Sequence, residues 1–227
     1  MIKPIAAVSW SGGKDSYLAL DRAAASFDIR ALITMFTEDG TRSRSHGQRP
    51  EVLDHQARLL NLSLVSGRGS WKSYEQEFKR LLRELARSGF SHVIFGDIFL
   101  DEHKAWVERV CNDCGLQAVE PLWGESTTEL FREFLATGAQ AQIVATKAVL
   151  LDKEWLGMTL SEHMLSGLES RGVDACGERG EYHTIVFTSP RMIAPLKLRE
   201  VGHLMHDGYW MLDLELSDTN NATGSSL

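Results

Sequence analysis

The 227-residue chain carries 24 Lys and Arg against 31 Asp and Glu, which gives a formal net charge of −7 at pH 7. A chain this acidic is a poor non-specific partner for nucleic acid, so we expect no stable nucleic-acid binding. No apolar run approaches the ~20 residues of a membrane helix, so we expect no membrane insertion. Three cysteines, an odd number, favour a reducing cytoplasm over a disulfide scaffold.

The first half of the chain alternates short apolar runs with longer amphipathic stretches. Strands are predicted, in chain order, at 5–9, 30–36, 62–66, 92–97 and 117–122. Helices are predicted between them at 14–26, 50–60, 71–88 and 101–114. Five strands with four intervening helices are typical of a doubly wound, parallel α/β sheet.

The rhythm changes after Pro121. The remaining elements are predicted as helices at 126–137 and 159–171, a strand at 142–146, a strand after "CGERGEYHT" and a last strand in "YWMLDLEL". We therefore expect an α/β domain over 1–120, a smaller α+β domain over 121–216 and a disordered tail over 217–227. The apolar last strand leaves open that chains pair into a homo-oligomer.

The segment "SGGKDS" (11–16) joins the first strand to the first helix. Gly12 and Gly13 permit a close backbone approach, and free N–H groups at a helix start favour an anion. Lys14 adds a positive charge. Asp15 would repel phosphate unless a Mg²⁺ ion lay between them, so the segment predicts a polyphosphate site. The plainer interpretation is an ordinary strand-to-helix turn with serine as the helix cap.

This segment resembles the fingerprint of the PP-loop ATP pyrophosphatases, which implies a HUP-type sheet of order 3-2-1-4-5, ATP as substrate and cleavage to AMP and pyrophosphate. Ligands of such sheets bind at the carboxyl ends of the strands. The residues then expected to bind ATP are Ser9, Ser11, Gly12, Gly13, Lys14, Asp15, Ser16, Met35, Phe36 and Gly96. Asp15 and Asp97 are the expected Mg²⁺ ligands, although Asp97 could instead cap the next helix.

A second unusual segment is "CGERGEYHT" (176–184), which holds Glu178, Glu181 and His183. Strand alternation predicts Glu181 and His183 on one face, and Tyr182 and Thr184 on the other. A carboxylate beside an imidazole could move a proton or bind an amine, but a turn with a surface ion pair explains the pattern equally well.

Together with "VERVCNDCGLQAVEPLWG" (107–124), these segments resemble the diphthine–ammonia ligase family. That resemblance implies an ATP-dependent amide-forming ligase that adenylates a carboxylate and amidates it with ammonia, with diphthine on elongation factor 2 as a candidate acceptor. The catalytic residues expected from it are Lys14, Asp15, Asp97, Glu178, Glu181 and His183. The segments "FGDIFLDEHKAW" and "SHGQRPEVLDHQARLLNL" look more like the bacterial branch, which would imply a small-molecule carboxylate, such as one met in corrinoid salvage.

Other interpretations stay open. Cys111 and Cys114 form a C-x-x-C that, with Cys176, could hold an iron–sulfur cluster of a tRNA-thiolating PP-loop enzyme. The chain could also be a non-catalytic ATP-binding sensor. The polar stretch 37–49 is either a solvated loop or a lid whose basic side chains contact phosphate or carboxylate; these are Arg42, Arg44, His46 and Arg49.

Overall fold

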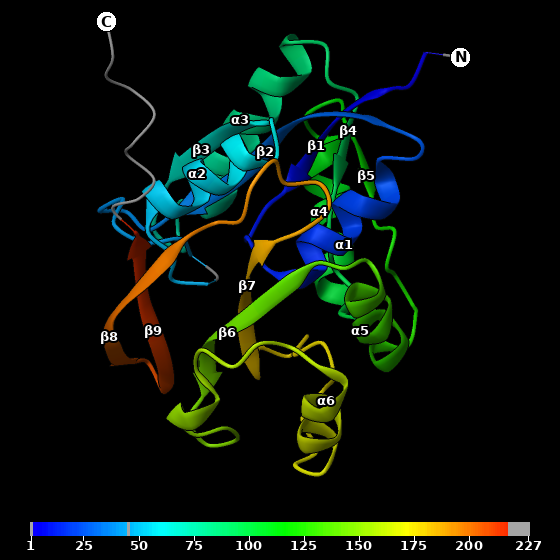
Figure 1. Cartoon of the computed structure of the whole chain (residues 1–227). Coiled ribbons are helices and arrows are strands. Elements are labelled where there is room, and N and C mark those ends of the chain that lie inside the picture. Colours follow the sequence, from blue (N-terminus) through cyan, green and yellow to red (C-terminus); the bar gives the residue numbers. More distant parts are fainter. Residues whose placement is uncertain (1, 45, 218–227) are drawn as a thin grey trace, which may run out of the picture.

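A computed structural model describes residues 2–44 and 46–217, which form two sheets (Figure 1). The first sheet is parallel, in the order β3-β2-β1-β4-β5. Its strands are β1 (Ile5–Ser9), β2 (Asp28–Phe36), β3 (Ser63–Arg68), β4 (His92–Ile94) and β5 (Gln117–Val119). The predicted fold class and strand order are therefore confirmed. Of the predicted tail, 218–227 lie outside the described residues.

Four helices connect these strands: α1 (Lys14–Ala23), α2 (Pro50–Leu59), α3 (Tyr74–Arg87) and α4 (Asp101–Asn112). Buried side chains of α1 and α2 join one hydrophobic cluster and those of α3 and α4 another, so the helices cover opposite faces of the sheet. β4 and β5 end earlier than the sequence predicts. Just after β4, Gly96 passes so close to α1 that a Cβ there would lie 2.9 Å from the Asp15 carbonyl carbon.

The second sheet is antiparallel, in the order β7-β6-β9-β8. Its strands are β6 (Gln140–Lys147), β7 (Tyr182–Thr188), β8 (Leu198–His206) and β9 (Tyr209–Leu216). Helices α5 (Thr127–Ala136) and α6 (Glu162–Glu169) and the 3₁₀ turn η1 (Lys153–Trp155) complete this half. No helix among the described residues is long and apolar enough to span a bilayer.

The sequence prediction misses β8. The strand is the exposed edge of a hairpin at the rim of the molecule, so its residues show no apolar alternation that would reveal it (Figure 1). Asp207 and Gly208 form the connecting turn, both with positive φ, at 48° and 80°. An Asp-Gly pair before an alternating strand is a hairpin signal, and it could have revealed the strand.

The two sheets share one hydrophobic cluster that reaches from β1 and α1 to β6 and β7. Tyr17 of α1 meets Phe134 of α5 edge to face, with ring centroids 6.0 Å apart. The boundary near residue 120 thus falls between two sheets whose cores are continuous, and it stays a prediction.

Gln56 of α2 joins the sheets through a fully buried amide. Its Oε1 accepts the indole N–H of Trp10 at 2.8 Å, while its Nε2 donates to the carbonyls of Gly12 at 3.1 Å and Val186 at 2.7 Å. One side chain thereby ties the glycine loop to β7. Trp10, Gly12 and Val186 are buried, so removal of the Gln56 amide would leave each of these groups without its hydrogen bond to Gln56.

We expect Gln56→Ala to lower the free energy of unfolding by about 2–4 kcal/mol, because it leaves a buried donor and weakens two buried acceptors. Urea denaturation at 25 °C measures the change. Gln140→Ala, at an exposed position of β6, is the matched control and should stay within about 0.5 kcal/mol of the wild type. Equal losses in the two variants would contradict a structural role for the Gln56 amide.

Candidate active site

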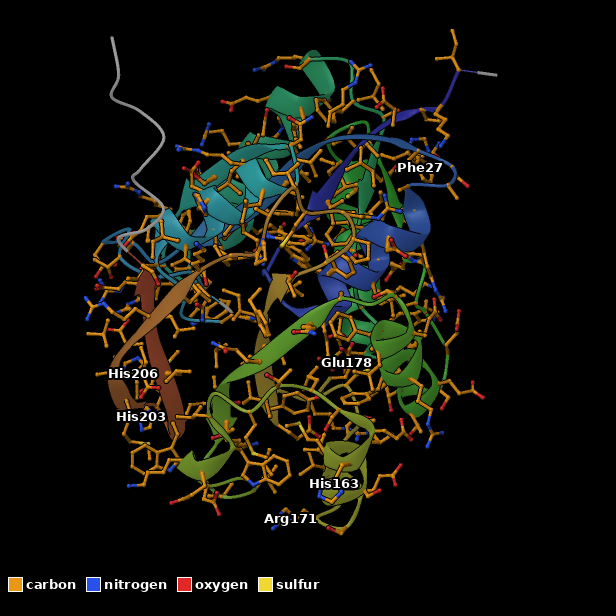
Figure 2. All side chains as sticks on the ribbon, viewed as in Figure 1. Phe27, His163, Arg171, Glu178, His203 and His206 are labelled. Carbon is orange, nitrogen blue, oxygen red and sulfur yellow. The ribbon has the colours of Figure 1, made fainter. Side chains whose placement is uncertain are left out.

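A cavity of about 260 Å³ lies between the carboxyl ends of β1, β2 and β4 on one side and the start of β7 on the other. Glu178 lies between the two sheets, whereas His203 and His206 lie on the distant hairpin (Figure 2). The lining residues from the parallel half are Ser9, Trp10, Ser11, Lys14, Asp15, Ser16, Ile33, Thr34, Met35, Arg44, His46, Trp71, Tyr74, Phe78, Gly96 and Asp97. Those from the antiparallel half are Cys176, Gly177, Glu178, Tyr182, His183 and Thr184.

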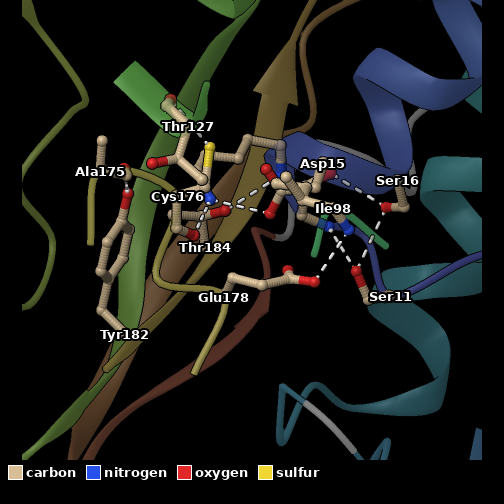
Figure 3. A network of polar contacts seen from close by, with 12 residues as sticks. Ser11, Asp15, Ser16, Ile98, Thr127, Ala175, Cys176, Glu178, Tyr182 and Thr184 are labelled. Carbon is tan, nitrogen blue, oxygen red and sulfur yellow. Dashed lines mark hydrogen bonds and ion pairs between the residues drawn. The ribbon is translucent and has the colours of Figure 1, made fainter. Parts of the chain in front are cut away.

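The glycine loop is built as a tight turn into α1. Gly12 has φ +84°, and a Cβ there would lie 2.7 Å from the side chain of Leu53, so only glycine fits. The Ser11 hydroxyl accepts the N–H of Gly13 at 3.3 Å and lies 3.2 Å from the Ser16 hydroxyl (Figure 3). Gly12 and Gly13 shape the turn but do not line the cavity.

The helix start is less open than the sequence predicts. The backbone N–H of Lys14 donates to the Thr184 hydroxyl at 3.1 Å, and the N–H of Val186 donates to the Gly12 carbonyl at 2.8 Å. Two polar groups of the loop are thus already bonded to β7. The loop serves as a junction between the sheets as well as a wall of the cavity.

The Lys14 ammonium is buried, with 2% of the residue exposed. It donates to Asp15 at 2.8 Å and to the Cys176 carbonyl, and lies 5.0 Å from the centre of the Tyr182 ring. Burial works to lower the pKa of Lys14, but the charge of Asp15 and the groups around it outweigh burial and raise the pKa. The ammonium therefore stays charged, with its donors directed at protein groups.

Three carboxylates, Asp15, Asp97 and Glu178, line the same cavity. Glu178 accepts the backbone N–H of Ile98 at 2.9 Å, as Figure 3 shows. Burial raises the pKa of Glu178 to about 7, and the two neighbouring carboxylates add to the shift. Asp97 does not cap the next helix, because the N-cap of α4 is Leu100.

A magnesium ion would find carboxylate ligands here. Over 2–44 and 46–217, no three His, Cys, Asp or Glu side chains form a group that could hold a metal by themselves. Mg²⁺ usually takes only one or two carboxylates together with substrate phosphates. Asp15 and Asp97 face one cavity and fit that requirement, so they remain the proposed ligands.

Glu181 and Phe36 are predicted site residues that do not line the cavity. β7 begins only at Tyr182, so Glu181 belongs to the preceding turn, where its carboxylate accepts the N–H of Arg179 at 2.9 Å. Of Glu181 and His183, only His183 lines the cavity, and their shared face stays a prediction. Phe36 lies one residue past Met35, the last residue of β2 to reach the cavity.

His183 faces His46 from the 37–49 loop, with ring centroids 4.5 Å apart. Burial and the charge of Lys14 lower the pKa of His183 to about 4. Burial and the facing His183 ring lower the pKa of His46 well below its usual value, and its Nδ1 lies 2.8 Å from the Thr184 carbonyl. Both imidazoles are therefore neutral at pH 7.

The 37–49 loop is bound to the antiparallel half. Arg42 donates to Asp213 of β9 at 2.6 Å, and Arg49 donates to the same carboxylate at 2.8 Å and 3.0 Å. These arginines lower the pKa of Asp213 far below its usual range, Arg49 most strongly. Arg44 and His46 of the same loop line the cavity, so the loop forms part of its wall, and we refer to it as the lid. An acid amid the apolar residues of "YWMLDLEL" was the available signal for the contact with Asp213.

The three cysteines do not lie together in one site. Cys111 is buried in α4, and Cys114 donates to the Lys79 carbonyl at 3.6 Å, both on the far face of the parallel sheet. Cys176 lines the cavity and donates to the Thr127 carbonyl at 3.3 Å. This separation removes the ligand set that an iron–sulfur cluster would need.

Comparisons with known proteins agree over both halves. Family models described as the diphthamide synthase N-terminal and C-terminal domains match residues 5–118 and 126–217. The diphthine–ammonia ligase of Rattus norvegicus is 34% identical over 118 residues, covering 50% of this chain and 43% of the relative. That of Schizosaccharomyces pombe is 27% identical over 205 residues, covering 79% of this chain and 34% of the relative. The chain thus spans less than half the length of these relatives.

One solved structure, described as a predicted subunit of a tRNA methyltransferase from Methanocaldococcus jannaschii, covers 84% of this chain and 100% of its own. It has a TM-score of 0.45 and 18% sequence identity. A likeness this weak carries no argument about the site.

We expect Glu178 to titrate near pH 7, and Asp97→Asn to lower its midpoint by removing a neighbouring negative charge. Carboxyl ¹³C shifts of glutamate-labelled protein measure both. Because the folded pKa is raised, wild type should lose about 1–3 kcal/mol of stability relative to Glu178→Gln between roughly pH 4.5 and 7. Glu51→Gln, on the exposed start of α2, should show no such trend. A Glu178 midpoint near pH 4.5 would contradict the effect of burial and of the neighbouring carboxylates on its pKa.

We expect Asp213→Asn to lower stability by about 1–3 kcal/mol at pH 7 and to speed hydrogen exchange in the 37–49 loop, because two arginines lose their carboxylate. The folded pKa of Asp213 is lowered, so this stability is present above the unfolded value of about 3.9 and is lost as the pH falls below it. The gap between variant and wild type, measured by urea denaturation, should therefore narrow at pH 3. Asp54→Asn, which breaks an exposed pair with Arg58, should change stability by less than about 0.5 kcal/mol. An unchanged exchange rate in Asp213→Asn would refute the lid contact.

Proposed function

We propose that this chain catalyses the ATP-dependent formation of an amide from a carboxylate and ammonia. The chain belongs to the diphthamide synthase family, whose two domain models match both of its halves. In the first step a carboxylate oxygen attacks the α-phosphorus of ATP, and the bond to pyrophosphate breaks. In the second step ammonia attacks the acyl carbon, and AMP leaves with the bonding electrons.

The observation that supports this reaction most is the meeting of two motifs. The "SGGKDS" loop and the "CGERGEYHT" segment come from different sheets and line one cavity. A nucleotide held by the loop would face an acceptor held by the second segment, as transfer between two bound reactants requires. A protein that only binds ATP would not need the second wall.

Activation of the carboxylate develops negative charge on the phosphates. The loop serines Ser11 and Ser16 would donate hydrogen bonds to them, and Asp15 and Asp97 would hold Mg²⁺, which neutralises that charge when bound. Lys14 is bonded to Asp15, so we assign it to orienting this carboxylate as well as to supplying positive charge.

Amidation needs uncharged ammonia and a group that accepts a proton from the attacking nitrogen. The neutral rings of His46 and His183 provide a polar site that does not add positive charge. Glu178, with a pKa of about 7, is suited to proton transfer near neutral pH and lines the cavity, whereas Glu181 does not. We therefore assign the general base to Glu178.

The acceptor that we propose first is diphthine on elongation factor 2, because the curated relatives are named diphthine–ammonia ligases. A small-molecule carboxylate is the second candidate, since the chain spans only 43% of the first of these relatives. The reaction steps are the same for either acceptor.

Incubation with ATP, Mg²⁺, ammonium and diphthine-bearing elongation factor 2 should yield factor-dependent AMP and pyrophosphate. Lys14→Ala with Asp15→Ala should slow AMP formation by about 10²–10⁴-fold, because charge stabilisation at the phosphates is lost. Asp152→Ala with Lys153→Ala removes a similar adjacent pair from an exposed turn and should leave the rate unchanged.

ADP in place of AMP would refute adenylation. If ATP binds but no nucleotide product forms, diphthine is the wrong acceptor, and small carboxylates are tested next. If those also fail, the chain is an ATP-binding sensor.

A further inference from the structure

Arg44 is the cavity residue whose position calls most clearly for a ligand. Its side chain lies on the lid, and its guanidinium carbon lies 4.3 Å from the centre of the Trp71 ring. Its Nε is buried and has no hydrogen-bond partner among the described residues. A buried donor of this kind is costly unless something in the cavity pairs with it.

The four basic side chains of the 37–49 loop divide into two pairs. Arg42 and Arg49 do not line the cavity and are bonded to Asp213. Arg44 and His46 line the cavity, and His46 is neutral. Arg44 is therefore the one charged side chain that the described part of the lid contributes to the cavity.

The other cation of the cavity wall is already engaged. Lys14 donates to Asp15 and to the Cys176 carbonyl and is only 2% exposed. In contrast, no described carboxylate forms an ion pair with Arg44, although Asp15, Asp97 and Glu178 line the same cavity. The Arg44 guanidinium lies instead over the Trp71 ring. Of the two cations, Arg44 is the one with a donor to offer an incoming anion.

The backbone of Arg44 places it on the nucleotide side. Its N–H donates to the carbonyl of Met35, at the end of β2, at 2.9 Å. β2 pairs with β1, which leads into the glycine loop. The side chain thus stands over the parallel sheet, whereas the acceptor is proposed to face the segment from the other sheet.

We propose that Arg44, which the lid already places in the cavity wall, binds a phosphate of ATP. The assignment rests on the proposed use of ATP and names the residue that recognises its phosphate chain. A planar guanidinium suits phosphate oxygens because it offers parallel donors, and Trp71 pre-orients it by stacking. Asp213 takes part indirectly, by holding the lid through Arg42 and Arg49.

Isothermal titration with α,β-methylene-ATP, tripolyphosphate and adenosine, each with Mg²⁺, tests the proposal. Arg44→Gln should weaken the binding of the nucleotide analogue and of tripolyphosphate by about 10- to 100-fold, because a charge-assisted bond is lost. The affinity for adenosine should stay within about twofold of the wild-type value. Arg58→Gln, on the exposed face of α2, is the matched control and should change none of the three.

Arg44→Lys keeps the charge without the planar fork and should lose less affinity than Arg44→Gln for the two phosphate ligands. Circular dichroism and thermal denaturation establish that both variants are folded. Unchanged affinity for the analogue in Arg44→Gln would overturn the proposal, and so would an equal loss for adenosine, which would indicate base stacking or a disordered lid. Absence of analogue binding by the wild type would instead refute the proposed function.

Discussion

The active site depends on the bonds that join the glycine loop to β7. Val186 donates to the Gly12 carbonyl, Lys14 donates through its backbone to Thr184, and the Gln56 amide donates to the carbonyls of both Gly12 and Val186. These buried contacts set the separation of the two sheets at the point where the cavity opens. The backbone of the loop is thereby fixed to the opposite wall of the cavity, which pre-organises the proposed nucleotide site.

The parallel sheet was predictable because its strands and helices each bury a continuous apolar surface, which leaves a clear period in the sequence. β8 left no such period, since this edge strand buries little. The close approach of Gly96 to α1 was also hidden, because it joins Gly96 to Asp15, 81 positions earlier in the chain. The periodicity of apolar residues indicates which side chains are buried. It does not indicate which distant backbone segment lies beside a residue.

The site was predictable where a short motif carries its own chemistry, and less so elsewhere. Lys14, Asp15, Asp97, Glu178 and His183 all line the cavity. Glu181 lies directly before β7 and does not line the cavity, which its motif could not reveal. The division of the loop into anchoring and cavity-facing residues was not predictable, since it depends on Asp213, 164 residues from Arg49 along the chain. Ion pairs across such distances follow from the fold and not from spacing.

The continuous core has a consequence for how the molecule responds to its ligands. Because one apolar cluster supports both walls of the cavity, neither wall can loosen without cost to the other, and unfolding is expected to be a single cooperative event. Occupancy of the cavity is then thermodynamically linked to the stability of the whole chain: a ligand at one hundred times its dissociation constant would add about 2.7 kcal/mol to the free energy of unfolding. Any ligand of the cavity would thereby stabilise the antiparallel half as well as the parallel one.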